Sequence, residues 1–199
     1  LVQSDTIAYL KKKYGQADVL LARHIVEHAS SSKKLIDSLS TFVTPRGYLI
    51  IELPDSERIL NIKNYPFIWE EHISYFTENA IFKIARSVGA EVVWIKRYPY
   101  PYEDSLVAVL RFNQKQVTLT SSKDEIQSVT ILLENFAKDL ESQRSYWRKN
   151  LEEYKAKGMK VAVFGAGHLS VKFINFLQLV DLIDCVIDDH PQKNEVVMP

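Results

Sequence analysis

The sequence predicts an α/β protein with a partial doubly wound sheet, a long helix and the start of a second strand–helix–strand domain. Two observations carry this prediction. Short apolar runs alternate with amphipathic stretches over residues 17–112, and a helical spacing of apolar residues then extends over residues 126–154. Alternation of strands and helices is typical of a sheet that helices cover on both faces.

Four strands are expected, at 17–22, 48–53, 91–98 and 105–112. The first two are continuous apolar runs, as expected of buried strands. The stretch TPRG at 44–47 is expected to form a turn. The last two strands are separated by only a short segment, which favours an antiparallel hairpin at the edge of the sheet.

Helices are expected between these strands. Ser30–Ser32 offer an N-cap for one helix, and a second is expected to start at Thr77 and to end with Gly89 as its C-cap. The connection over residues 55–75 is too long for a routine loop, and it is therefore a candidate functional loop.

A capping pattern, S-x-x-E, at Ser122 precedes three-and-four spacing of apolar residues, which predicts one helix of about 33 residues ending at Gly158. Its aromatic side chains are expected to form a packing face. We expect three regions: the later part of a first domain at 1–119, a linking helix at 120–158, and the start of a second domain at 159–199.

The chain is expected to be a fragment. It opens on a helix that leads directly into a strand, and one strand–helix–strand unit cannot cover its own sheet. Partner strands are expected upstream, downstream or in a second copy of the chain, and the last arrangement would be a homo-oligomer.

Composition excludes several classes of protein. Lys plus Arg and Asp plus Glu both number 25, which argues against a general nucleic-acid or anionic-membrane binder. The sequence has no apolar run of the ~20 residues that a membrane span needs, and no signal-peptide pattern. Cys185, the single cysteine, is expected to be a buried, inert thiol in a strand, and a reducing cytoplasm is the expected location.

The stretch IWEEHISYF at 68–76 is a candidate catalytic loop. The ordinary pKa of imidazole lies near neutral pH, so His72 suits the role of a general base. Glu71 is placed to orient that ring, and Trp69 and Tyr75 could wall the site.

Arg23 and His24 directly follow the strand at 17–22, where ligands bind in doubly wound sheets. His24 and His28 have the i, i+4 spacing of a metal-binding pair, but the sequence shows no clear third ligand, so no metal is expected. Farther along, Gly165 and Gly167 lie in a strand–turn–helix pattern, FGAGHLS, which fits either a nucleotide-binding turn or an architectural one.

Three stretches in this order, ARHIVEH (22–28), EEHISYF (70–76) and FGAGHLS with IDDHPQK (164–193), resemble the S-adenosylmethionine-dependent C-methyltransferases of nucleotide-sugar biosynthesis. The resemblance implies a class I methyltransferase-like sheet within 1–119 and a Rossmann-like domain beginning at 159. It implies that the glycine-rich cofactor motif and a cysteine-bound zinc lie before Leu1.

The resemblance also implies roles for individual residues. His72 would take a proton from the carbon beside a ketone, with Glu71 positioning it, and Ala22, Arg23 and His24 would lie beside S-adenosylmethionine. The residues that would bind a small-molecule substrate, a nucleotide sugar, are Trp69, Tyr75, Gly165, Gly167, Asp188 and Lys193.

Two departures from the family pattern bear on the substrate. Trp69 replaces a tyrosine, and Glu103 and Asp104 replace glycines where two carboxylates would repel a diphosphate. Two other classes stay open: an NAD(P)- or nucleotide-binding Rossmann protein that uses the Gly165 turn and Asp188, and a non-catalytic remnant of the methyltransferase scaffold.

Overall fold

The computed structural model describes residues 4–68, 71–101, 103–112 and 123–193. The chain divides into two compact units. The first contains Leu1–Arg58 and Glu70–Lys123, and the second contains Ile59–Trp69 and Asp124–Pro199.

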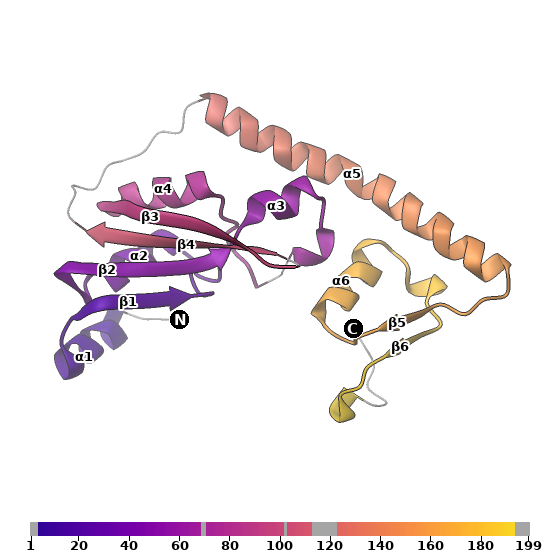
Figure 1. The fold of residues 1–199 in the computed structure, drawn as a ribbon, viewed down its shortest axis with the longest axis horizontal. Coiled ribbons are helices and arrows are strands. Elements are labelled where there is room, and N and C mark those ends of the chain that lie inside the picture. The colour runs from indigo at the N-terminus through magenta and orange to yellow at the C-terminus, as the bar shows by residue number, and fades with distance from the viewer. Residues whose placement is uncertain (1–3, 69–70, 102, 113–122, 194–199) are drawn as a thin grey trace. The chain divides into compact units, whose positions relative to one another are not determined.

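The first unit is built on a four-stranded sheet (Figure 1). Its strands are β1 (Ala17–Arg23), β2 (Val43–Pro54), β3 (Ala90–Pro99) and β4 (Asp104–Phe112), in the spatial order β1-β2-β4-β3. β1 runs parallel to β2, whereas β4 is antiparallel to both β2 and β3. The α/β fold class and the antiparallel hairpin at the sheet edge are therefore confirmed.

The helices of this part of the chain are α1 (Ser4–Tyr14), α2 (Ser32–Ser40) and α4 (Glu78–Ser87), and α3 (Ser56–Asn61) spans the boundary between the two units. Two of the predicted starts are confirmed by their caps. The Ser31 side chain accepts from the backbone N–H of Lys34, and Thr77 accepts from that of Ala80. Gly89 follows α4 with φ of 72°, a left-handed conformation that favours glycine.

The core of the first unit lies on β2 and β4, the two inner strands. Leu49, Ile51 and Leu53 alternate along β2 and are fully buried. Ile36 of α2 and Ile81 of α4 are equally buried and belong to the same cluster. Apolar residues at every second position of a strand share one face of the sheet. That face of β2 and the apolar faces of α2 and α4 therefore form one core.

Two local expectations were wrong. β1 is not a buried strand, because it lies at the sheet edge, with Val19 and Leu21 more than half exposed. TPRG is not a turn but an irregular part of β2. The register of β2 against β1 shifts between the pair Ala17–Val43 and the pair Val19–Tyr48. Gly47 suits this bulge, since a Cβ there would lie 2.6 Å from the backbone oxygen of Asp18.

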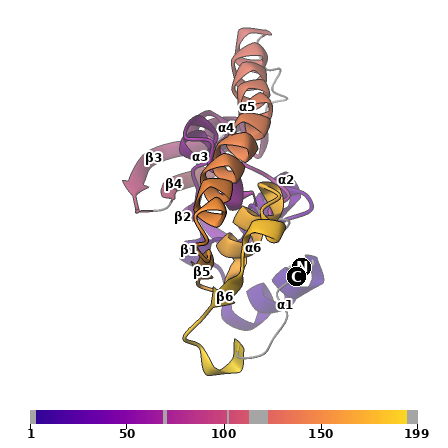
Figure 2. The same cartoon turned by 90° about the vertical axis from the view of Figure 1, so that its right-hand side faces the viewer.

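The second unit contains α5 (Lys123–Ala156), β5 (Ala162–Phe164), α6 (His168–Phe176), β6 (Cys185–Ile187) and the 3₁₀ turns Tyr65–Phe67, Val180–Leu182 and Pro191–Lys193. α5 is a single helix of 34 residues, unbroken in Figures 1 and 2, and this confirms the predicted length. The capping serine at 122 lies outside the described residues. Among the described helices, none has the length and apolar character that a bilayer crossing requires.

The aromatic face of α5 is a packing face, as predicted. The Trp147 ring packs edge-on against Phe173 of α6, with centroids 5.0 Å apart, and Phe136 packs against Tyr65 at 4.4 Å. β5 and β6 pair in parallel as a two-stranded sheet. Cys185 on β6 is exposed rather than buried, because a sheet of two strands has too little cover for both faces.

Candidate functional site

The candidate site lies at the carboxyl ends of the parallel strands β1 and β2. Arg23 and Glu52 are direct partners in the strand register, so both side chains emerge at the same edge. The Arg23 guanidinium donates two hydrogen bonds to the Glu52 carboxylate, one of them from Nη2 to Oε1 at 3.2 Å. These contacts lower the pKa of Glu52 below its ordinary value.

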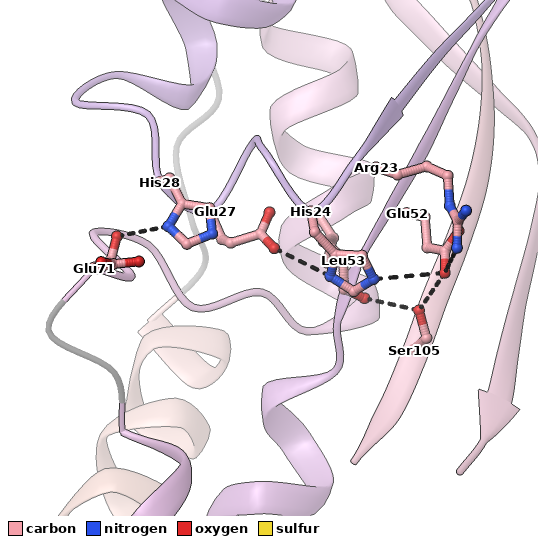
Figure 3. Close-up of polar contacts among 8 residues, drawn as sticks. All are labelled: Arg23, His24, Glu27, His28, Glu52, Leu53, Glu71 and Ser105. Carbon is pink, nitrogen blue, oxygen red and sulfur yellow. Dashed lines mark hydrogen bonds and ion pairs between the residues drawn. The ribbon is translucent and has the colours of Figure 1, made fainter. Parts of the chain in front are cut away.

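His24 comes next and lies between two carboxylates (Figure 3). Its Nδ1 is 3.4 Å from Oε1 of Glu27, and its Nε2 is 3.6 Å from Oε1 of Glu52. Its backbone has φ of 48°, a left-handed conformation uncommon outside glycine, and it turns the chain out of β1. Non-glycine residues in this conformation cluster at functional sites.

Glu27 is the most deeply buried charged side chain of this cluster, with 1% relative exposure. Neither of its carboxylate oxygens accepts a hydrogen bond from any residue that the structure describes. Its backbone carbonyl, by contrast, accepts from the N–H groups of Ile73 (2.9 Å) and Ser74 (3.1 Å). A buried carboxylate without donors is costly unless a cation compensates it.

The segment after β1 and the candidate catalytic loop are joined by further hydrogen bonds. His28 Nδ1 lies 2.9 Å from the carbonyl oxygen of Glu71 (Figure 3), and since a carbonyl only accepts, Nδ1 carries the proton and donates. Ser32 Oγ lies 3.2 Å from Ser74 Oγ and 3.1 Å from the carbonyl of Val26. These bonds hold the loop against the end of β1.

His72 is therefore placed beside His28, with ring centroids 4.7 Å apart, and beside Tyr75 at 5.9 Å. Glu71 is exposed, and its backbone carbonyl accepts the hydrogen bond that His28 donates. Tyr75 is 39% exposed. Trp69, the remaining predicted residue of this loop, lies outside the described residues.

The predicted cofactor residues differ in exposure. Ala22 is buried in the core, so it can offer a cofactor only its backbone, whereas Arg23 and His24 are exposed. His28 also lines a pocket of about 390 Å³ together with Ile25, Ala29, Ser30, Ser31, Lys34, Leu35 and Ser38.

The two carboxylates that replace glycines have different surroundings. Asp104 is buried and forms an ion pair with Arg58, which also donates to the carbonyl of Tyr100. Burial raises the pKa of Glu103, with opposing effects from the charges of His24 and Glu27. The charges of His24 and Glu27 thus act on Glu103, whereas the Asp104 carboxylate is paired with Arg58.

The other four predicted substrate-binding residues lie in the second unit, around the glycine turn. Gly165 has φ of 98°, which glycine favours, and its N–H donates to the carbonyl of Ile187. Asp188 accepts from the backbone N–H of Ala166 (2.7 Å) and from Lys193 Nζ (2.9 Å), so its carboxylate closes the turn. A Cβ on Gly167 would meet nothing within 4 Å.

Family models match both parts of the chain. Residues 3–94 match the model of a methyltransferase domain, and residues 112–199 match that of a C-methyltransferase C-terminal domain. The chain carries these two domains. The predicted methyltransferase class is thereby confirmed at the level of domains, and the candidate cluster of His24, Glu27 and His72 lies within the methyltransferase domain. A comparison with curated proteins finds none that matches.

Solved structures similar to the chain include LepI in complex with SAM, with 12% identity over 49% of this chain and 27% of that one and a TM-score of 0.39. A pericyclic reaction enzyme has the same identity and coverage and a TM-score of 0.40. An O-methyltransferase family protein from Burkholderia thailandensis has 14% identity over 59% of this chain and 34% of that one, with a TM-score of 0.37. The chain thus spans about a third or less of their lengths, and similarity this low transfers no function.

Asp188 of the C-methyltransferase C-terminal domain is expected to make stability depend on pH. Hydrogen bonds from His190 N–H, Lys193 Nζ and Ala166 N–H lower its pKa to about 2, from an ordinary value of 3.8. The charged form therefore stabilises the fold at neutral pH, and this contribution is lost as pH falls through that range. In urea titrations, Asp188→Asn should be less stable than wild type at pH ~7, and the difference should shrink below pH ~4. A difference independent of pH would contradict this origin.

Several site residues were missed or left without a role by the sequence interpretation: Glu27, His28, Glu52 and Ser105. Two signals were available. Glu52 is a charged residue within the apolar run YLIIEL, and Glu27 lies beside His28 at the end of ARHIVEH. Ser105 Oγ, 3.4 Å from Oε1 of Glu52, carries no such signal, because its proximity depends on the pairing of β2 with β4.

Proposed function

We propose that the protein is an S-adenosylmethionine-dependent C-methyltransferase that acts on the carbon beside a ketone in a keto-sugar nucleotide or a related small metabolite. The observation that carries the proposal is the position of His72. Within a matched methyltransferase domain, this imidazole lies beside His28 and the buried carboxylate of Glu27. The nearby Glu27 carboxylate supports the role of His72 as a base, because it would stabilise the positive charge of the ring after the ring has taken a proton.

The residues at the end of β1 suit a cationic cofactor. Glu27, Glu52 and Glu103 present carboxylates around His24, and the Glu27 oxygens accept no hydrogen bond from the described residues. S-adenosylmethionine, when bound, supplies a methyl group on a positively charged sulfur. The backbone of Ala22 and the side chains of Arg23 and His24 would hold it beside these carboxylates.

His72 would remove the proton. A lone pair of its imidazole takes the hydrogen from the carbon next to the carbonyl, and the electrons of the broken C–H bond form an enolate. The ring then carries a positive charge close to the Glu27 carboxylate, whose attraction favours the protonated state. His28, held by the Glu71 carbonyl, fixes the position of the ring from one side and Tyr75 from the other.

Substrate binding is proposed for Trp69 and Tyr75 at the loop, and for Gly165, Gly167, Asp188 and Lys193 at the glycine turn. Glu103 favours an acceptor that keeps its phosphates away from the end of β1, because a nearby carboxylate repels a diphosphate. The side chain of Asp104 makes no such demand, since Arg58 neutralises it.

The proposal is tested by incubating the protein with S-adenosylmethionine and keto-sugar nucleotides that carry deuterium on the carbons beside the ketone. The expected product carries a new C-methyl group and has lost one deuterium from that carbon, as read by NMR and mass spectrometry. A parallel incubation without cofactor in ordinary water should show slow loss of deuterium catalysed by the base alone. Methylation on oxygen or nitrogen with all deuterium retained would contradict the proposal.

A further inference from the structure

We propose that Glu27, His28 and His72 of the methyltransferase domain form a binding site for a divalent transition-metal ion. Each residue offers one donor atom, and the three atoms lie within 4.8 Å of one another. Glu27 and His28 come from the segment after β1, and His72 comes from the loop before α4. The sequence showed His24 and His28 as a pair without a clear third ligand, whereas the fold groups His28 with Glu27 and His72 instead.

The state of Glu27 is the first reason. Its side chain is only 2% exposed, and neither carboxylate oxygen accepts a hydrogen bond from the described residues. His24 Nδ1 lies 3.4 Å from one oxygen without donating a hydrogen bond to it. Buried polar groups nearly always have a partner, and an ion is one of the explanations for a group that lacks one.

The orientation of His28 is the second reason. Its Nδ1–H donates to the carbonyl of Glu71, which leaves the lone pair on Nε2. In Figure 3 the second ring nitrogen lies on the side of Glu27, away from Glu71. A ring with one N–H bound to a backbone carbonyl and its other nitrogen facing a carboxylate is the usual arrangement of a metal-binding histidine. Two electron-pair donors that face each other need a positive charge between them.

The donor set indicates which ion. Two imidazoles and one carboxylate suit Zn²⁺ and similar transition metals, whereas Mg²⁺ and Ca²⁺ prefer oxygen ligands. Bonds of about 2.0–2.1 Å in a tetrahedral site place donor atoms roughly 3.4 Å apart, so the three side chains need only small movements to close on an ion.

A bound ion would compete with the proposed function. His72 has one lone pair for either the ion or the substrate proton, so occupancy by Zn²⁺ should suppress proton removal. Only this consequence rests on the proposed function. Binding of the ion is measured without any turnover, so failure of one proposal leaves the other testable.

The test is calorimetric titration of the whole protein with Zn²⁺ at neutral pH, with Co²⁺ as a second probe read by its visible absorption. One ion should bind per chain, Co²⁺ should develop the bands of a low-coordinate nitrogen and oxygen site, and Mg²⁺ should not bind. Glu27→Gln and His28→Ala each alter a direct ligand, so each should weaken Zn²⁺ binding by at least the roughly 10- to 100-fold that loss of an outer-shell partner costs. Glu91→Gln is the matched control: Glu91 lies on β3, 41% exposed and paired with Arg111, and its loss should not change affinity.

Three results would overturn the site. These are the absence of Zn²⁺ binding, an affinity that Glu27→Gln and His28→Ala leave unchanged, and NMR evidence that His28 carries two protons at neutral pH without ion uptake. In the last case a proton supplies the charge that Glu27 needs. Circular dichroism of each variant shows whether it is folded, and Glu27→Gln keeps nearly the shape of the native side chain while it removes the charge and replaces one carboxylate oxygen with an NH2 group.

Discussion

His72→Ala is expected to lower turnover by about 10²- to 10⁴-fold, the usual contribution of a positioned general base. Affinity for S-adenosylmethionine should stay nearly unchanged, because the residues proposed to hold the cofactor lie at the end of β1. Steady-state assays of methyl transfer and calorimetric titration with the cofactor measure the two quantities separately. Deuterium loss in the absence of cofactor should disappear together with turnover.

Ile73→Ala is the control for this experiment. Ile73 is the next residue, its side chain is 60% exposed, and its backbone N–H, which donates to Glu27, is kept in alanine. This variant should retain turnover. If His72→Ala turned over as fast as Ile73→Ala, His72 would not be the base. If cofactor affinity fell in parallel with turnover, a role of His72 in folding the site would replace its role in chemistry.

Ile51→Ala is expected to lower the unfolding free energy of the methyltransferase domain by about 2–5 kcal/mol. Ile51 is fully buried in β2, where it pairs with Ala22 of β1 on one side and Ala108 of β4 on the other. Neighbouring backbones on both sides leave little freedom to collapse into the cavity. Because the chain has two compact units, the measurement should report on the unfolding of the first unit alone. Amide hydrogen exchange of β2 and β4 measures the stability of that unit.

Val19→Ala is the matched comparison, since it removes apolar atoms from a strand residue that is 52% exposed. Its effect should stay within about 0.5 kcal/mol. Each 1.4 kcal/mol corresponds to tenfold faster exchange when opening is at equilibrium, so the two variants should be separated clearly. Equal protection in both would mean that β2 is not the centre of the core.

The elements that the sequence predicted well are those whose signals are local. The long helix was expected to have about 33 residues and has 34, because apolar spacing and a terminal glycine both lie within the segment itself. Thr77 and Gly89 bound α4 through contacts within a single turn. The errors have the opposite character. Val19 is exposed and 44–47 is a bulge because of where β1 lies in the sheet, which no local pattern records.

The candidate site divides in the same way. His72 and His24 could be singled out from residue type and from position beside a strand or in a long connection. The surroundings of these histidines could not be predicted, because His28 and Glu71 are 43 positions apart in the sequence and come into contact only in the folded protein. The sequence interpretation assigned the Glu71 side chain to orient His72, while the structure has the Glu71 carbonyl holding His28.

By itself, the sequence determined that strands and helices alternate, that α5 is one long helix, and that a long connection containing His72 follows the second strand. Short-range spacing and hydrogen bonding carry all of this information. Only the tertiary structure decided that Glu27 is buried, that no residue in the described part of the chain donates a hydrogen bond to its carboxylate, and that it lies between His24 on one side and His28, the neighbour of His72, on the other (Figure 3). The reason is physical: the burial of a charge, and its need for a cation, depend on which distant segments exclude water from it.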